Sequence, residues 1–231
     1  MAIATDITLD ESTHTYTDSK GTEYTSVSKI IGKYKAPFDR LGIANKQAAK
    51  TGRDVNEILA EWDSAAPYGT EVHKQIECFF LGQDYDQSLI LPYIPTFTAW
   101  KKQDCEFLPE QILYHPELKI AGTADMIVRR GDSYSIMDWK TNKAIYKTAF
   151  GGAKLSTPLN HLDDCNFIHY SLQLSIYAAM LGTKINRLSL IHLPREKGTL
   201  EVIRCPFLKE EVGSIFGQLR LDNFDFDDLP F

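Results

Sequence analysis

Two carboxylates and a lysine lie close together in the middle of the chain. Asp138 and Lys140 are one residue apart in a β-prone run, and Asp125 stands in the preceding β-prone run. Side chains alternate along a strand, so Asp138 and Lys140 should point the same way. Neighbouring carboxylates repel each other unless a cation lies between them, and Mg²⁺ or Mn²⁺ prefers such oxygen ligands. An adjacent ammonium can stabilise charge on a phosphate, so we expect metal-assisted chemistry rather than a surface Asp–Lys pair.

Polar residues at helical spacing add to this pattern. His73 precedes Glu77 by four residues, and His169, Gln173 and Tyr177 follow one another at intervals of four. Residues four apart share one face of a helix. A lone histidine in an apolar helix is more often a core residue. Polar side chains in a buried helix need partners, which a catalytic pocket can supply, but by itself the second stripe is weak evidence for such a pocket.

The first hundred residues are expected to hold one hairpin followed by helices. Residues 7–25 contain two β-prone runs around a turn, and Ser26 has the character of a helix N-cap. Residues 39–65 predict one or two helices broken near Gly52. Pro67 is expected to open another helix that ends at Gly82, and a further helix should cover 94–102.

The pattern changes at Phe107, after which strands prevail. Runs at 110–114, 120–128 and 134–139 predict three strands, followed by a loop over 141–160 and a helix over 167–181. Two more strands (187–193 and 200–205) and a last helix (208–219) complete the order. We therefore expect an α/β fold with a mixed central sheet flanked by helices. The expected parts are 1–105 (hairpin and helices), 106–220 (core) and 221–231 (acidic tail).

Four short motifs in this order carry a resemblance to a known family. They are G-T-x-V-H at 69–73, G-T-A-D at 122–125, D-W-K at 138–140 and Q-x-x-x-Y at 173–177. Together they resemble the RecB-like branch of the PD-(D/E)XK nuclease superfamily, near phage-type exonucleases and the mitochondrial genome maintenance exonuclease. Residues 24–30 also resemble the start of those proteins. The resemblance implies the restriction-endonuclease-like core with a mostly helical N-terminal elaboration.

The resemblance also implies roles for individual residues. His73, Asp125 and Asp138 would ligate Mg²⁺ or Mn²⁺ together with the backbone carbonyl of Trp139, and Lys140 would be the catalytic lysine. Gln173 and Tyr177 would steady the site or contact the DNA backbone, and Glu77 or Glu110 would add an acidic contact. The reaction would be phosphodiester hydrolysis by a metal-activated water.

Some relatives hold an iron–sulfur cluster through a tight cysteine group near the C-terminus. Cys78, Cys105, Cys165 and Cys205 are widely spaced, so no cluster is expected, and free thiols in a reducing compartment are the simpler interpretation. Basic residues that would track DNA are Lys143, Lys147 and Lys154 after the D-W-K motif, with Arg129 and Arg130, and Lys46, Lys50 and Arg53 in a helical arch over the strand.

The net charge of −6 and pI of about 5.5 argue against a protein that coats nucleic acid non-specifically. They do not exclude a nuclease, which needs only a local basic track. The sequence has no apolar run of about 18 residues, so no membrane span is expected. It also lacks a secretory signal, so a cytoplasmic location is expected, in the host if a phage encodes the protein.

The chain ends in an acidic and aromatic tail that resembles the tip of bacterial single-stranded DNA-binding protein. Its residues are Asp225, Phe226, Asp227, Asp228, Pro230 and Phe231. In that family the terminal Phe fills an apolar pocket with a basic rim, so this tail would dock on a protein that normally binds the tip. A solvated acidic tail without a partner is the competing interpretation.

Three functions fit these observations. The first is a DNA exonuclease that acts at single- or double-stranded ends in recombination, replication or repair. The second is a binding protein that kept the nuclease fold and recruits partners through its tail, and the third is an endonuclease of the same superfamily. The intact Asp125, Asp138 and Lys140 favour an enzyme over a binding protein, while His73 and the Gln173–Tyr177 helix favour an exonuclease.

Overall fold

The computed structural model describes residues 6–13, 15–195 and 198–222. Within them, eight strands form one mixed sheet in the order β1-β2-β3-β5-β6-β7-β8, with β4 paired to β5. The expected α/β class with a mixed sheet flanked by helices is confirmed. The strands are β1 (Ile7–Asp10), β2 (Thr15–Asp18), β3 (Glu23–Ser26), β4 (Glu106–His115), β5 (Ile120–Arg130), β6 (Ser133–Lys140), β7 (Ile185–His192) and β8 (Glu201–Cys205).

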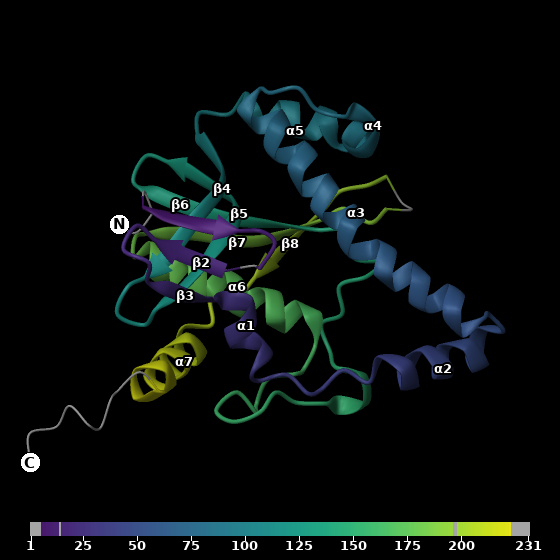
Figure 1. Cartoon of the computed structure of the whole chain (residues 1–231). Helices are drawn as coiled ribbons and strands as arrows, with labels where there is room; N and C mark the ends of the chain where they lie inside the picture. The colour runs from purple at the N-terminus through teal and green to yellow at the C-terminus, as the bar shows by residue number, and fades with distance from the viewer. Residues whose placement is uncertain (1–5, 14, 196–197, 223–231) are drawn as a thin grey trace, which may run out of the picture.

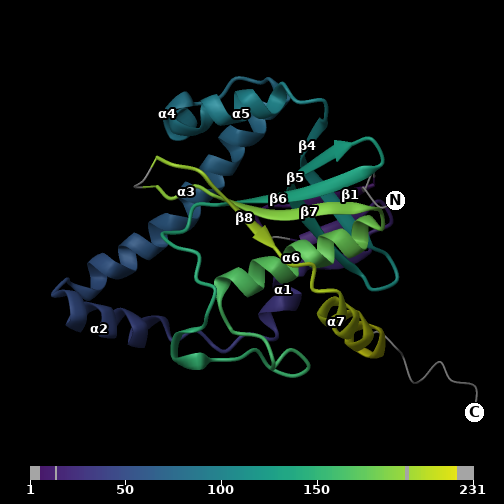
Figure 2. The same cartoon turned by 180° about the vertical axis from the view of Figure 1, so that it is seen from behind.

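Helices cover both faces of this sheet (Figures 1 and 2). One face packs against α1, α6 and α7 in a core that includes Ile30, Leu172 and Ile215. The other face packs against α3 and α5 in a second core around Phe97 and Trp139. The helices are α1 (Val27–Gly32), α2 (Arg40–Thr51), α3 (Val55–Leu81), α4 (Gln87–Ile90), η1 (Leu91–Tyr93), α5 (Ile94–Lys101), η2 (Phe150–Gly152), α6 (Asn166–Leu181) and α7 (Lys209–Asp222).

Along one edge of β5, the pairings with β3 and with β6 are separated by a short unpaired stretch. The parallel pairing with β3 ends at Ala121, and the antiparallel pairing with β6 begins at Met126. Strand β4 meanwhile pairs along almost the whole other edge of β5. Asp125 therefore lies where the neighbours of β5 diverge, at a place where side chains from several elements can converge.

The helices begin and end at residues that commonly cap helices. The Ser26 side chain accepts a hydrogen bond from the Lys29 N–H at the start of α1. Gly52, Gly82 and Gly182 end α2, α3 and α6 in the left-handed conformation that glycine adopts without a Cβ clash.

One sequence prediction was incomplete and one was wrong. The hairpin predicted at 7–25 is present as β1 and β2, and β3 extends it by pairing with β2 and carrying the chain onto β5. Pro67 does not open a helix but lies inside α3, a single helix of 27 residues. Proline removes one backbone hydrogen bond there, and its exposed surroundings leave the freed carbonyl open to water.

The expected boundaries at residues 105 and 220 remain predictions, and residues 223–231 of the tail lie outside the described residues. Within the described residues, no helix combines the length and apolar character needed to cross a bilayer.

Candidate active site

Asp138 and Lys140 form a buried ion pair at the end of β6. The Lys140 ammonium meets Asp138 Oδ2, and both side chains point to the same side of the strand, as the alternation predicts. The ammonium also lies 4.4 Å from the centre of the Tyr170 ring on α6. Burial alone would lower the pKa of Lys140, but the charges of Asp138 and Asp125 outweigh it and raise that pKa. Lys140 is therefore held as a cation.

Asp125 connects β5, β6 and α3. Its Oδ2 accepts a hydrogen bond of 2.8 Å from the Trp139 backbone N–H and lies 3.4 Å from His73 Nδ1. The Trp139 ring is buried in the core beneath α3 and α5, which fixes the backbone on either side of it. The recorded contact of Trp139 with the site is thus through its N–H, whereas the sequence resemblance implied its carbonyl.

Glu110 completes a cluster with Asp125 and His73. In the β4–β5 register it stands opposite Asp125, between the pairs Pro109↔Met126 and Gln111↔Ala124. Its φ of 48° is unusual for a residue other than glycine and marks a local departure from strand geometry. One ligand atom from each of His73, Glu110 and Asp125 lies within 4.8 Å of the others. These three residues therefore offer a nitrogen and two carboxylates to one cation.

The carboxylates crowd one another in a poorly solvated place. Burial, followed by the charges of Asp125, Glu77 and Asp138, raises the pKa of Glu110 to about 8. Burial and Asp125 raise the pKa of Asp138 to about 6, against the opposing effect of Lys140. Asp138 Oδ2 is buried, and its recorded partner is the Lys140 ammonium. A divalent cation would relieve this repulsion, so the donor set fits a metal such as Mg²⁺ or Mn²⁺.

Neither Asp138 nor Glu77 belongs to the group of three residues whose ligand atoms converge. Asp138 instead faces Lys140. Glu77, one turn after His73 on α3, pairs with Lys74 at 2.8 Å. Its charge nevertheless contributes to the raised pKa of Glu110.

Tyr177 packs against the backbone of β5 from α6. A Cβ on Gly122 would lie 2.6 Å from Tyr177 Cε1, so only glycine leaves room for this ring. The Tyr177 hydroxyl accepts a hydrogen bond of 3.0 Å from the Gln173 amide. His169, the third residue of the predicted stripe, instead contacts Asp164 at 2.7 Å.

A cleft of about 1120 Å³ leads to the Lys140–His73 region. Its walls are the middle of α3, the end of β6 with the segment after it, Tyr170 and the residues just after β7. Gly69 lets α3 pass close to the segment after β6, because a Cβ there would lie 3.1 Å from Thr141 Oγ1. The lining includes Glu61, Trp62, Tyr68, His73, Lys140, Lys143, Tyr170 and Arg195.

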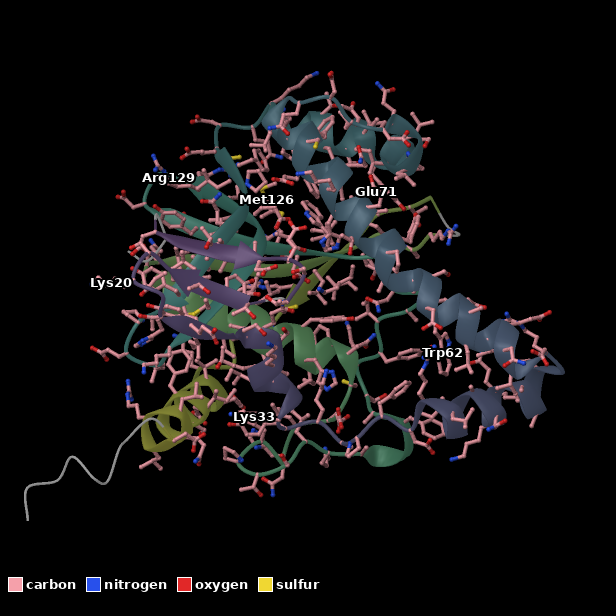
Figure 3. The ribbon with its side chains drawn as sticks, viewed as in Figure 1. Lys20, Lys33, Trp62, Glu71, Met126 and Arg129 are labelled. Atoms are coloured by element: carbon pink, nitrogen blue, oxygen red, sulfur yellow. The ribbon has the colours of Figure 1, made fainter. Side chains whose placement is uncertain are left out.

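Sequence reasoning missed the aromatic residues of this cleft. Trp62 extends from the part of α3 beside α2 (Figure 3) and lies 6.0 Å from the Phe38 ring. The Arg195 guanidinium lies 4.4 Å over the Tyr68 ring. Tyr170 is three residues before Gln173 on α6, which is a helical spacing that could have identified it. No spacing signal in the sequence connects Trp62 or Arg195 to the motifs.

The predicted DNA-tracking residues differ in their surroundings. Lys143 lines the cleft and lies 3.3 Å from Glu61, which also pairs with Arg53 at 2.8 Å. Lys147 lies 5.5 Å from the Phe167 ring, and Lys154 is paired with Asp163 at 2.6 Å. Lys46 and Lys50 are exposed on α2. Arg129 pairs with Glu106, while Arg130 donates a hydrogen bond to Gln103, and both stand at the end of β5 away from α2.

Comparison with known proteins gives one family match. A sequence model of the PD-(D/E)XK nuclease superfamily matches residues 34–211. None of the curated proteins compared with the chain matches it. A solved structure titled "Crystal structure of SSO0001" is similar over 87% of this chain and 76% of that one, with 14% sequence identity and a TM-score of 0.40.

Proposed function

The chain belongs to the PD-(D/E)XK nuclease superfamily, and from this membership we propose that it is a divalent-metal-dependent exonuclease acting on DNA ends. The observation that carries the proposal is the position of the Lys140 ammonium. It is held by Asp138 and lies one strand away from the cluster of His73, Glu110 and Asp125. A cation and a candidate metal site side by side are the two parts that phosphodiester hydrolysis needs.

We assign the roles as follows. His73, Glu110 and Asp125 would hold a metal, with Asp138 as a further ligand at their edge, and the metal would supply Lewis-acid stabilisation and a water of lowered pKa. Asp138 and the Tyr170 ring position the Lys140 ammonium, which orients the attacking water and stabilises the developing negative charge. Tyr177 and Gln173 fix β5 and thereby Asp125.

We further propose that a single DNA strand enters through the cleft. Trp62, Tyr68 and Tyr170 offer ring faces on which bases stack, while Lys143 and Arg195 offer charge to the backbone. Aromatic side chains combined with a cationic groove are typical of single-strand binding, and stacking tolerates any base. The same cleft favours an exonuclease over an endonuclease that reads a duplex.

The test uses end-labelled single-stranded, double-stranded and covalently closed circular single-stranded DNA with Mg²⁺ or Mn²⁺. We expect degradation of the linear single strand, none in EDTA, and no cleavage of the circle. Asp138→Ala and Lys140→Ala should lower the rate by at least about 10²-fold, and Lys20→Ala, in an exposed turn, should retain the activity. Cleavage of the circle at the rate of the linear strand would establish an endonuclease, and an active Asp138→Ala protein would overturn the site.

We propose separately that the acidic tail recruits the nuclease to a protein partner, an idea that rests on sequence alone. Removing residues 223–231 should leave DNA digestion by the purified protein unchanged. The same deletion should abolish binding to a protein that recognises the tip of the single-stranded DNA-binding protein. Equal binding by the full-length and shortened proteins would exclude this role.

A further inference from the structure

A second cavity, of about 260 Å³, lies on the face of the sheet that α5 covers only in part. Its floor is formed by the first halves of β6 and β7, and Trp100 and Phe107 line one side. Ser135 on this floor precedes Asp138 by three residues, which is about 10 Å along a strand. Ser135 and Asp138 also point to opposite faces of β6. The cavity is therefore separate from the candidate active site.

Ser189 is a buried hydroxyl without a partner in this cavity. It is 1% exposed, and its Oγ makes no hydrogen bond with the described residues. Leu188 and Leu190 point into the core beneath α6, so Ser189 between them faces the cavity, which it lines. Buried polar groups nearly always have a partner, so this hydroxyl indicates that the cavity receives a polar ligand.

Two arginines give the cavity a positive charge. Arg187 is in register with Ser135, and Arg130 with Ser133, and all four residues line the cavity. Arg130 donates a hydrogen bond of 2.9 Å to the neutral Gln103 amide. Among the ion pairs of the described residues, none involves Arg130 or Arg187. Their charges are therefore free to bind an anion.

We propose that this cavity binds the phosphate group of a nucleotide. Guanidinium groups and hydroxyls together match the oxygens of a phosphate monoester, and arginine is the preferred side chain for that recognition. Trp100 and Phe107 provide the apolar wall that a base or sugar needs. The phosphate belongs either to a free nucleotide or to the 5′ end of a DNA strand. The site does not depend on the catalytic proposal, because it uses none of those residues.

The test measures binding in EDTA, so that no cleavage occurs, by titration calorimetry on the full chain. The ligands are deoxyadenosine monophosphate, inorganic phosphate, deoxyadenosine, and a short oligonucleotide with or without a 5′-phosphate. We expect saturable binding of the monophosphate and at least tenfold weaker binding of deoxyadenosine. A preference for the 5′-phosphorylated oligonucleotide over the free nucleotide would identify the strand end as the source, and the reverse would identify the nucleotide.

Three variants make the test specific. Arg187→Gln should weaken binding of the monophosphate at least tenfold. Arg129 pairs with Glu106, so Arg129→Gln should change that binding less than twofold. Ser189→Ala should weaken binding severalfold without lowering the melting temperature, because it removes an unpaired buried hydroxyl. Equal binding of deoxyadenosine and its monophosphate, or equal losses for Arg187→Gln and Arg129→Gln, would overturn the proposal.

Discussion

The ring of Tyr177 occupies the space that a side chain at position 122 would need. A Cβ on Gly122 would lie 2.6 Å from Tyr177 Cε1 and 2.9 Å from the hydroxyl oxygen. Tyr177 is buried, so its ring cannot swing into solvent. The glycine of the G-T-A-D motif and the tyrosine of the Q-x-x-x-Y motif are therefore one packing unit.

Gly122→Ala should reduce both stability and activity. The added methyl group forces the Tyr177 ring or β5 to move, and such overpacking costs about 1–3 kcal/mol. Asp125 follows three residues later on β5, so its position should shift and DNA cleavage should fall. Gly217→Ala is the matched control, because that helix position has open space and alanine there should stabilise by about 0.5–1 kcal/mol. A Gly122→Ala protein with wild-type melting and activity would contradict the packing argument.

Lys140→Ala should separate catalysis from stability. Loss of a charge that stabilises the transition state costs about 10²–10³-fold in rate. The same change leaves Asp138 buried without its cation, which destabilises the metal-free protein by about 3–5 kcal/mol. Lys143→Ala removes an exposed pair with Glu61 and should cost no more than about 1 kcal/mol in denaturant unfolding. Similar unfolding midpoints for the two variants would refute the buried pairing.

The metal-free protein should lose stability as the pH rises from about 4.5 to 8. The pKa of Glu110 is raised from 4.5 to about 8, so the folded state holds a proton that the unfolded state releases. Asp138, with a pKa of about 6, acts in the same direction over a lower range. The stability that these two groups contribute is fully present below the pKa values that they have in the unfolded chain. It is lost as the pH rises through the pKa values that they have in the folded protein. Thermal melts in EDTA at several pH values measure this effect. The melting temperature should fall less steeply with rising pH for Glu110→Gln than for the wild type.

Metal addition should reverse this trend. A divalent cation replaces the protons, so its stabilising effect on the melting temperature should be larger at pH 8 than at pH 6. Calorimetry in two buffers of different ionisation enthalpy should detect protons released on binding, fewer of them in Glu110→Gln. Proton release unaffected by Glu110→Gln would remove Glu110 from the ligand set.

Trp62→Ala should weaken binding of a single strand. Each stacked base contributes about 1–3 kcal/mol, so affinity for an oligonucleotide should fall about tenfold in calcium or EDTA. Phe207→Ala is the control, since that exposed ring packs with Lys209 away from the cleft. A duplex that offers no single-stranded ends should bind to the Trp62→Ala and Phe207→Ala proteins with equal affinity. An unchanged affinity of Trp62→Ala for the single strand would remove the cleft from the strand's path.

The sequence located the strands that carry Asp125, Asp138 and Lys140, because alternation and turn residues are local signals. It named Glu110 only as one of two possible acidic contacts, because the position of Glu110 beside Asp125 depends on the β4–β5 register and on a positive φ that cannot be read from residue type. Pro67 misled the prediction of α3, since a proline favours a helix start unless tertiary packing sustains the helix through it. Arg195 joins the cleft only through the fold, which brings the segment after β7 beside α3.

The continuity of α3 has one further consequence. Trp62 and His73 are eleven residues apart on this unbroken helix, about three turns, so they project from the same side roughly 16 Å apart. A stacked strand advances about 3.4 Å per nucleotide, so about five nucleotides span that interval. If a strand follows the cleft as proposed, fragments shorter than this span reach either Trp62 or the proposed catalytic centre, and digestion should slow at that length.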